Sequence, residues 1–249
     1  MGRIAVERGI GLHVDCCLGG FILPFAKMLR KNNIPDFDFR VPGVSSMSMD
    51  THKYGYALKG ASVVLYKSKE LRHSQYFCYA DWTGGMYTTP TIAGSRSGGL
   101  IAQCWASLMA LGREGYLRHA EQVLQVAANI KEGVQRVQGL TLLGPADAMI
   151  VCFTGKDGLN IYSVGDNMSK KGWCLNALQQ PPCLHICCTV THVGQESAFL
   201  SDLQAAVDEA RTDPAEKEGK AAIYGMTSSL PAGPVNELLK VYNDVVLKV

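Results

Sequence analysis

The sequence lacks long apolar runs, single-sign charge blocks and low-complexity tracts. No window of its 249 residues approaches the roughly 18 continuous apolar residues of a membrane-spanning helix. Its 24 basic and 22 acidic residues leave a net charge of +2 without any basic block, which argues against a nucleic-acid binder. With 47% hydrophobic and 18% charged residues, the composition is typical of one large domain, or of one domain plus a smaller one.

The cysteines lack the spacing of a zinc site. The sequence has nine of them, and its vicinal pairs, Cys16-Cys17 and Cys187-Cys188, seldom bridge internally. This pattern indicates free thiols in a reducing compartment. Although Cys183 and Cys187 flank His185, no second ligand cluster follows, so we expect no metal site.

The first half of the chain alternates short strands, loops and long helices. Apolar residues predict a buried strand over 10–14 that ends at Asp15, and another over 61–66. The segment between them is expected to be mostly loop, around a short helix near 25–31. Residues 81–99 are rich in Gly, Thr, Ser and Pro and predict a long ordered loop of functional importance.

A helical pattern covers residues 99–139, with a break at 112–115. After residue 139 the pattern changes to alternating strands and helices. The later elements follow a β-β-α-β-α order: strands 140–144 and 148–153, helix 161–171, strand 184–190, a helix around 199–207, a charged loop 213–220 and an amphipathic tail helix 235–249. We therefore predict an α/β protein with a domain over 1–139 and a small α/β domain over 140–249.

Lys53 and Asp15 are the strongest candidates for chemistry. Lys53 follows His52 after a short strand, where a rigidly held lysine could form a Schiff base. Asp15 ends an apolar strand, the position at which open α/β sheets bind ligands. Taken singly, Lys53 reads as a solvated surface lysine and Asp15 as a strand-end cap. Together they favour pyridoxal phosphate, whose ring nitrogen needs an acidic partner.

Longer strings extend this interpretation over nearly the whole chain. They are LHVDCCLGGF, DFRVPGVSSMSMDTHKYGYALKGASVVLY, ADWTGGMYTTPTIAGSRSGG, MSKKGWCLNALQQPPCLHICCTVTH and AIYGM. These strings resemble the sphingosine-1-phosphate lyases, within the group II pyridoxal-phosphate-dependent decarboxylases. The sequence departs from those lyases at Leu58 and Ser97, where they usually carry proline, and at Cys16, where they carry alanine.

The resemblance implies the aspartate-aminotransferase fold (type I), in which 1–139 is the C-terminal part of the large cofactor-binding domain. It also implies a homodimer with active sites at the subunit interface. Lys53 would bind the cofactor aldehyde, Asp15 would pair with the ring nitrogen, and His52 would lie beside the cofactor phosphate. Cys17 would lie near the cofactor, although a small buried apolar role explains it equally well.

Five more residues are assigned through the resemblance. Lys59, Tyr87, Ser95 and Arg96 would bind the phosphorylated substrate, and Tyr56 would share in its binding and turnover. Interface packing for Tyr56 and a structural loop anchor for Arg96 stay open as alternatives. The general base is not identified: Lys53, Tyr56 and a group of the neighbouring subunit are candidates.

The implied reaction cleaves the C2–C3 bond of sphingoid base 1-phosphates to a long-chain aldehyde and phosphoethanolamine. Full-length members of the family are expected at the endoplasmic reticulum membrane, on its cytosolic face, and this chain by itself in the cytoplasm. Because much of the large domain precedes the aspartate strand in this fold, we expect an N-terminally truncated chain that is inactive alone. An amino-acid decarboxylase of the same fold and a non-catalytic dimerising fragment are the alternatives.

Overall fold

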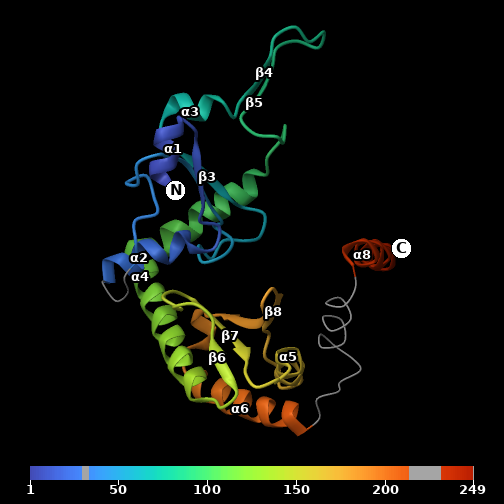
Figure 1. Ribbon diagram of the computed structural model, residues 1–249. Coiled ribbons are helices and arrows are strands. Elements are labelled where there is room, and N and C mark those ends of the chain that lie inside the picture. The colour runs from blue at the N-terminus through green and yellow to red at the C-terminus, as the bar shows by residue number, and fades with distance from the viewer. Residues whose placement is uncertain (30–33, 213–230, 249) are drawn as a thin grey trace. The chain divides into compact units, whose positions relative to one another are not determined.

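The computed structural model describes residues 1–29, 34–212 and 231–248, which form two compact units (Figure 1). The first unit is Met1–Glu121 and the second is Gln122–Val249. The division falls inside helix α4 (Gly98–Arg136), whereas the domain boundary at 139 remains a prediction. The charged loop 213–220 and the AIYGM segment lie outside the described residues.

A three-stranded sheet organises the first unit. Its strands are β1 (Leu12–Asp15), β2 (Val44–Met49) and β3 (Val63–Tyr66), in the order β1-β2-β3. β1 and β2 run parallel, and β3 runs antiparallel to β2. The strand that ends at Asp15 is confirmed but not buried, because its residues alternate between half-buried and exposed. β2 ends just before the segment that contains Lys53, as expected for a second strand end.

Short helices surround this sheet: α1 (Gly2–Arg8), the 3-10 helix η1 (Gly19–Phe21), α2 (Leu23–Leu29) and α3 (Lys69–His73). The sequence did not predict α1, because seven residues are too few for a helical period to stand out. Gly20 lets the η1 turn lie directly on the end of β2. A Cβ at Gly20 would be 2.7 Å from the Cβ of Met49, so this close approach needs glycine.

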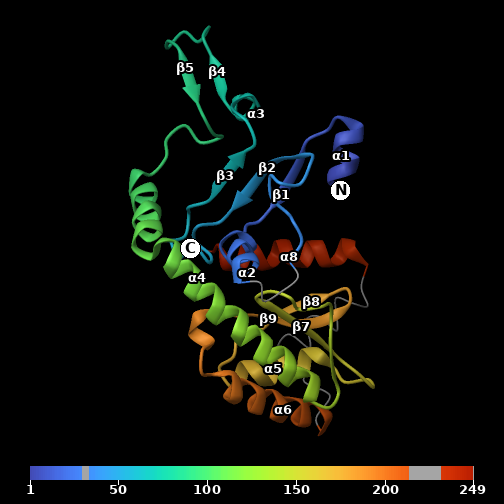
Figure 2. The same ribbon diagram turned by 90° about the vertical axis from the view of Figure 1, so that its left-hand side faces the viewer.

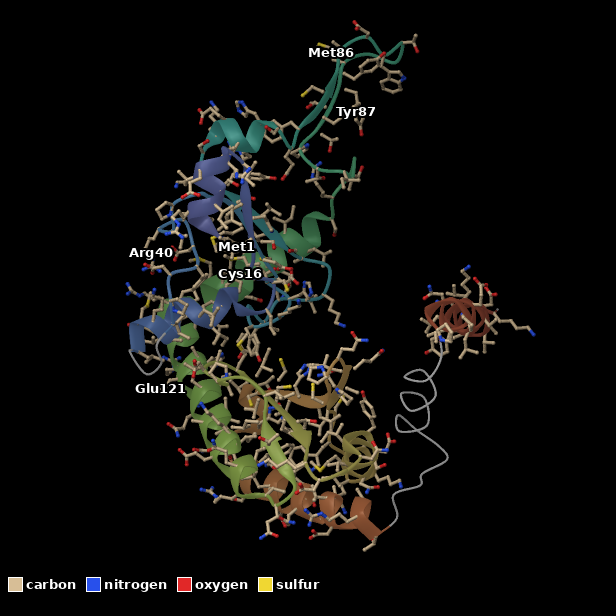
Figure 3. The ribbon with its side chains drawn as sticks, in the orientation of Figure 1. Met1, Cys16, Arg40, Met86, Tyr87 and Glu121 are labelled. Atoms are coloured by element: carbon tan, nitrogen blue, oxygen red, sulfur yellow. The ribbon has the colours of Figure 1, made fainter. Side chains whose placement is uncertain are left out.

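The segment 81–99, predicted as a loop, contains the turn and the second strand of a hairpin. β4 (Phe77–Tyr79) and β5 (Tyr87–Thr89) pair antiparallel and project from the first unit toward the labelled Met86 (Figure 3). Met86 is 92% exposed, and Phe77, Trp82 and Tyr87 are also exposed. The hairpin therefore presents aromatic side chains to solvent.

Helix α4 has the break that its sequence predicts. Gly112 is non-helical, with φ 56° and ψ −176°, a conformation open to glycine. Before the break, Trp105 and Met109 are exposed on the predicted apolar face, whereas Leu124 and Ile130 after it are buried. Among the helices of residues 1–29, 34–212 and 231–248, none combines the length and the apolar character that a membrane span requires.

The second unit contains a four-stranded antiparallel sheet in the order β6-β7-β9-β8. Its strands are β6 (Leu140–Leu142), β7 (Ile150–Gly155), β8 (Asn176–Gln179) and β9 (Pro182–Cys187). The predicted pairing of the first two strands is confirmed. β8 was not predicted, because it is a short, largely exposed edge strand without apolar alternation.

Helices cover this second sheet. They are α5 (Ile161–Lys170) and α6 (Glu196–Thr212), with the 3-10 helix η2 (Val190–His192) between β9 and α6. α5 and α6 lie side by side, and α5 packs on β9 (Figure 2). Phe153, Leu184 and Leu203 are among the side chains that are fully buried here. The predicted tail helix is present as α8 (Ala232–Val246).

We predict that Leu184→Ala destabilises the second unit. Leu184 has 0% exposure, so its truncation should cost roughly 2–5 kcal/mol in the free energy of unfolding. Hydrogen exchange of the β7 and β9 amides measures this locally. Leu178→Ala, at a position with 43% exposure, is the matched control and should change little. Equal losses in the two variants would contradict this description of the core.

Candidate active site

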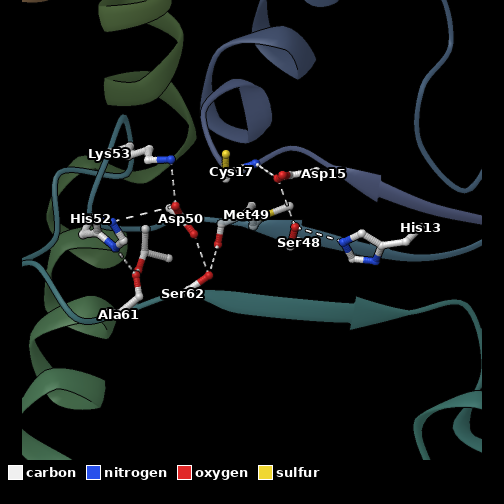
Figure 4. Close-up of polar contacts among 11 residues, drawn as sticks. His13, Asp15, Cys17, Ser48, Met49, Asp50, His52, Lys53, Ala61 and Ser62 are labelled. Carbon is white, nitrogen blue, oxygen red and sulfur yellow. Dashed lines mark hydrogen bonds and ion pairs between the residues drawn. The ribbon is translucent and has the colours of Figure 1, made fainter. Parts of the chain in front are cut away.

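The candidate site lies where β1 and β2 end (Figure 4). Backbone hydrogen bonds continue past both strands: the Cys16 N–H donates to the Ser48 carbonyl at 2.8 Å, and the Asp50 N–H donates to the Cys17 carbonyl at 3.2 Å. This pairing brings Asp15 and Cys17 next to the segment that leads from Asp50 to Lys53. Residues 38 positions apart in the sequence thus share one edge of the sheet.

The Asp15 carboxylate is held in a defined orientation. Its Oδ1 accepts hydrogen bonds from the Cys17 N–H at 2.9 Å and from the Ser48 hydroxyl at 3.2 Å. These donors, with the Cys17 N–H as the largest cause, lower the pKa of Asp15 below its ordinary value. The carboxylate is exposed and ionised at neutral pH, and both of these bonds fall on its Oδ1.

Lys53 is paired with Asp50, a residue that the sequence did not single out. The Lys53 Nζ lies 2.9 Å from the Asp50 Oδ2, and the Ser62 hydroxyl donates to the Asp50 Oδ1 at 2.6 Å. The pKa of Asp50 is lowered, first by Ser62 and then by Lys53. In turn, the pKa of Lys53 is raised, first by Asp50 and then by the thiol of Cys17.

Lys53 sits in a tight turn. Its N–H donates to the Asp50 carbonyl at 3.2 Å, and the Ala57 N–H donates back to the Thr51 carbonyl at 2.9 Å. A Cβ at Gly55 would lie 2.5 Å from the Thr51 carbonyl oxygen, so this turn excludes any larger residue there. The turn therefore holds the Lys53 backbone rigidly, as covalent catalysis by a lysine requires.

His52 has a fixed tautomer. Its Nδ1 lies 2.6 Å from the carbonyl oxygen of Ala61, which can only accept, so Nδ1 carries a proton. The Nε2 lies 3.8 Å from the Asp50 Oδ2. The ring is thereby held between the Ala61 carbonyl, just before β3, and the carboxylate that pairs with Lys53. Its predicted role beside the cofactor phosphate stays a prediction.

Tyr56 is strained and desolvated. It has φ 58°, the left-handed region that residues with a Cβ seldom adopt. Its hydroxyl is buried without a hydrogen-bond partner among the described residues, and its ring meets His119 edge-on at 4.9 Å between centroids. Burial raises the pKa of Tyr56 and, with a smaller effect from Arg118, lowers the pKa of His119. Both side chains are therefore neutral near pH 7.

Arg96 lines a hollow of about 470 Å³ together with Thr51, Ala61 and Ser62. Its guanidinium donates to the Gly94 carbonyl at 3.0 Å and to the Thr89 hydroxyl at 3.3 Å. These contacts fit a loop anchor, and the position beside Ser62 also fits a site residue.

The other predicted substrate-binding residues do not join the Asp15–Lys53 cluster. Lys59, Tyr87 and Ser95 are exposed, and in the described part of the chain none of them bonds to it. Tyr87 lies on the projecting hairpin, 6.1 Å from both Phe77 and Trp82 between ring centroids. Their roles in substrate binding stay predictions.

We predict that Asp50→Asn lowers the pKa of Lys53. The neutral amide removes the charge that favours the protonated amine, so Lys53 should lose its proton at lower pH. ¹³C-methylation of the lysines followed by NMR titration measures this, with the Lys53 resonance assigned from its loss in Lys53→Arg. The ion pair stabilises the fold below the pKa of an unfolded-chain lysine, and this contribution disappears as pH rises through the raised pKa.

Asp81→Asn is the matched control for this titration. It removes the same charge from the exposed hairpin of the same unit. An unchanged Lys53 titration in Asp50→Asn, or an equal change in Asp81→Asn, would contradict the assigned pairing.

Known proteins match both the sequence and the fold. Residues 1–156 match the pyridoxal-dependent decarboxylase conserved domain. The chain is 49% identical to the sphingosine-1-phosphate lyase of Dictyostelium discoideum, over 93% of this chain and 43% of that protein. A solved sphingosine-1-phosphate lyase from Burkholderia pseudomallei is 46% identical with a TM-score of 0.81, covering 85% of this chain and 48% of that one.

A more distant structure agrees in fold alone. The glutamate decarboxylase of Lactobacillus brevis has a TM-score of 0.70 at 20% identity, over 84% of this chain and 50% of that one. The chain spans about half, or less, of the length of these proteins. The predicted aspartate-aminotransferase-like α/β fold is confirmed. The matched domain contains the whole Asp15–Lys53 cluster, and the chain belongs to the pyridoxal-dependent decarboxylase family.

Proposed function

We propose that this chain is the lysine-bearing part of a pyridoxal-phosphate-dependent lyase, and that the whole enzyme cleaves the C2–C3 bond of sphingoid base 1-phosphates. The main support is the position of two groups: the amine of Lys53 and the carboxylate of Asp15 lie at the ends of two neighbouring parallel strands. The 46–49% identity to sphingosine-1-phosphate lyases supports this substrate class. The products would be a long-chain aldehyde and phosphoethanolamine.

Asp15 fits the ring nitrogen of the cofactor. Both of its hydrogen bonds fall on Oδ1, and a carboxylate has about four lone-pair positions, so Oδ2 can accept from a ring N–H. Because its pKa is lowered, it carries the negative charge that keeps such a nitrogen protonated. When bound, pyridoxal phosphate supplies the electron sink for carbon–carbon bond cleavage.

Lys53 fits the cofactor aldehyde once its amine has lost a proton. Its side chain is 34% exposed and can reach an incoming ligand. A protonated amine is not nucleophilic, so Lys53 must first lose its proton and leave Asp50. Cys17 lies against both Asp15 and Lys53, which supports its predicted place near the cofactor. His52 would stand on the phosphate side.

The substrate side of the site is built from more exposed residues. Arg96 and Lys59 would supply positive charge to the substrate phosphate, and Tyr87 and Ser95 would contribute from the hairpin and the loop that follows it. For the proton of the C3 hydroxyl, Lys53 is better suited than Tyr56. Burial makes the ionised phenol of Tyr56 unfavourable, whereas a lysine released from Asp50 can accept a proton.

Two other functions compete with this one. An amino-acid decarboxylase of the same fold would bind a substrate carboxylate at this edge and release carbon dioxide. A non-catalytic chain that binds a second copy would leave Lys53 without a covalent ligand. Lys59 and the Gly85–Arg96 segment resemble the lyases, which favours the lyase function over the decarboxylase; cofactor absorbance separates both enzymes from the non-catalytic chain.

Assembly and location follow from the same proposal. The whole enzyme would be a homodimer with its sites at the subunit interface. It would act at the cytosolic face of the endoplasmic reticulum membrane. A group of the neighbouring subunit would then remain a candidate for the general base.

We predict that Lys53 captures pyridoxal phosphate when the complete large domain is present. Borohydride should reduce the carbon–nitrogen double bond between them to a stable amine, and peptide mapping should find the pyridoxyl label on Lys53. Lys53→Arg should lose the label while its far-ultraviolet circular dichroism persists. A label on Lys59 or Lys67 in the unaltered chain would contradict the assignment of Lys53 as the cofactor-binding lysine.

We predict that Lys59→Ala weakens turnover of the phosphorylated substrate. A charge-assisted hydrogen bond to phosphate contributes about 1.5–3 kcal/mol, so kcat/KM should fall roughly 10- to 100-fold. The assay follows aldehyde release from sphinganine 1-phosphate by a chimera in which this chain replaces the matched segment of the Dictyostelium lyase. Lys67→Ala, at another exposed lysine, is the control. Equal kinetics in the two variants would remove Lys59 from the site.

A further inference from the structure

We propose that His13 is a positioning residue, which orients the Asp15 carboxylate through the hydroxyl of Ser48. The proposal rests on the function given above, because it concerns the acid that meets the cofactor ring. Neither His13 nor Ser48 stood out in the sequence. In the structure they form a continuous row of hydrogen bonds along β1 and β2 that ends on Asp15 (Figure 4).

Three hydrogen bonds make up this row. The His13 Nδ1 lies 2.8 Å from the Ser46 hydroxyl oxygen, and its Nε2 lies 3.0 Å from the Ser48 hydroxyl oxygen. The Ser48 hydroxyl is 3.2 Å from the Asp15 Oδ1. Both ring nitrogens of His13 are thus occupied, although the ring itself is exposed.

The register of the two strands produces this row. His13 lies opposite Ser46 and Asp15 opposite Ser48, so all four side chains share one face of the sheet. Val14 and Met47 alternate with them, and Met47 is buried in the apolar cluster on the other face. Since the strands pair through their backbones, sheet formation does not need the polar row.

The hydrogens in the row have a definite direction. Asp15 is ionised and only accepts, so the single hydrogen of the Ser48 hydroxyl points toward it. The Ser48 oxygen must then accept from His13, which places a proton on Nε2. In the neutral ring, Nδ1 accepts from the Ser46 hydroxyl. Each donor therefore polarises the next, and the row ends on a charge, where hydrogen bonds are strongest.

The charge state of Asp15 is consistent with this arrangement. Its pKa is lowered first by the Cys17 N–H, with further contributions from the Cys17 thiol, from Ser48 and from His13. Within the described ranges, the titratable groups that act on the carboxylate are thus His13 and Cys17, with Cys16 next to it, whose own pKa is raised by burial. His13 acts on Asp15 in two ways: by its charge when protonated, and by orienting Ser48.

The nearby Ser45 offers a matched control. Its hydroxyl accepts from the Leu12 N–H at 3.0 Å and donates to the Leu12 carbonyl at 3.1 Å. Ser45→Ala therefore removes a hydroxyl from the same strand pair without touching the row. His13→Gln is the conservative variant, because its amide retains one donor and one acceptor group.

The first test is NMR titration of the Asp15 carboxyl carbon in the full chain without cofactor. We expect Ser48→Ala and His13→Ala to move the Asp15 titration to higher pH, Ser45→Ala to leave it in place, and His13→Gln to restore part of the shift. Unchanged titration in Ser48→Ala and His13→Ala, with native circular dichroism, overturns the proposal. So does an equal shift in Ser45→Ala.

The second test adds pyridoxal phosphate to the chimera with the Dictyostelium lyase and follows its absorbance. Ser48→Ala and His13→Ala should raise the apparent dissociation constant about tenfold, the effect of one hydrogen bond to a charged group. If borohydride labels Lys53 in the wild-type chimera and the variants bind the cofactor with unchanged affinity, the positioning role alone is overturned. If Lys53 stays unlabelled in the wild-type chimera, the proposed function is overturned, whatever the Asp15 titration shows.

Discussion

The parallel pairing of β1 with β2 is the constraint on which the site depends. Parallel strands finish at the same edge of a sheet, so residues that end each strand meet although they are far apart in the sequence. Backbone hydrogen bonds beyond the strands, from Cys16 to Ser48 and from Asp50 to Cys17, hold these residues close together. A slip of this register by one residue would turn Asp15 to the apolar face.

The two faces of this small sheet have different roles: one packs in the core and the other carries the site. One carries Val14 and Met47 and belongs to the apolar cluster, and the other carries polar side chains at the alternate positions. The turn after β2 adds a second kind of rigidity, because Gly55 is packed against the Thr51 carbonyl and Tyr56 adopts a left-handed backbone. Strain of this kind is commonly found at functional sites, where surrounding contacts impose it.

The sequence was enough to predict those site residues whose place in the chain, directly after a strand, already indicates a role. Asp15 and Lys53 each follow a strand, and the chemistry of the cofactor links a carboxylate with a lysine. Asp50, Ser48 and Ser62 could not be found in this way, because their importance arises from register and from contacts across strands. The same holds for β8, an exposed edge strand defined by its hydrogen bonds to β9 and not by an apolar pattern.

The ion pair between Asp50 and Lys53 has a thermochemical consequence. Because the amine is held in its charged form, it must give up its proton before it attacks an aldehyde, and the enthalpy of that ionisation adds to the heat of capture. When the imine nitrogen then stays neutral, the proton passes to the buffer, and the heat of capture depends on the ionisation enthalpy of that buffer. A charged amine is also slow to react with sugars and other carbonyl compounds, so the Lys53 amine is protected from modification before the cofactor binds.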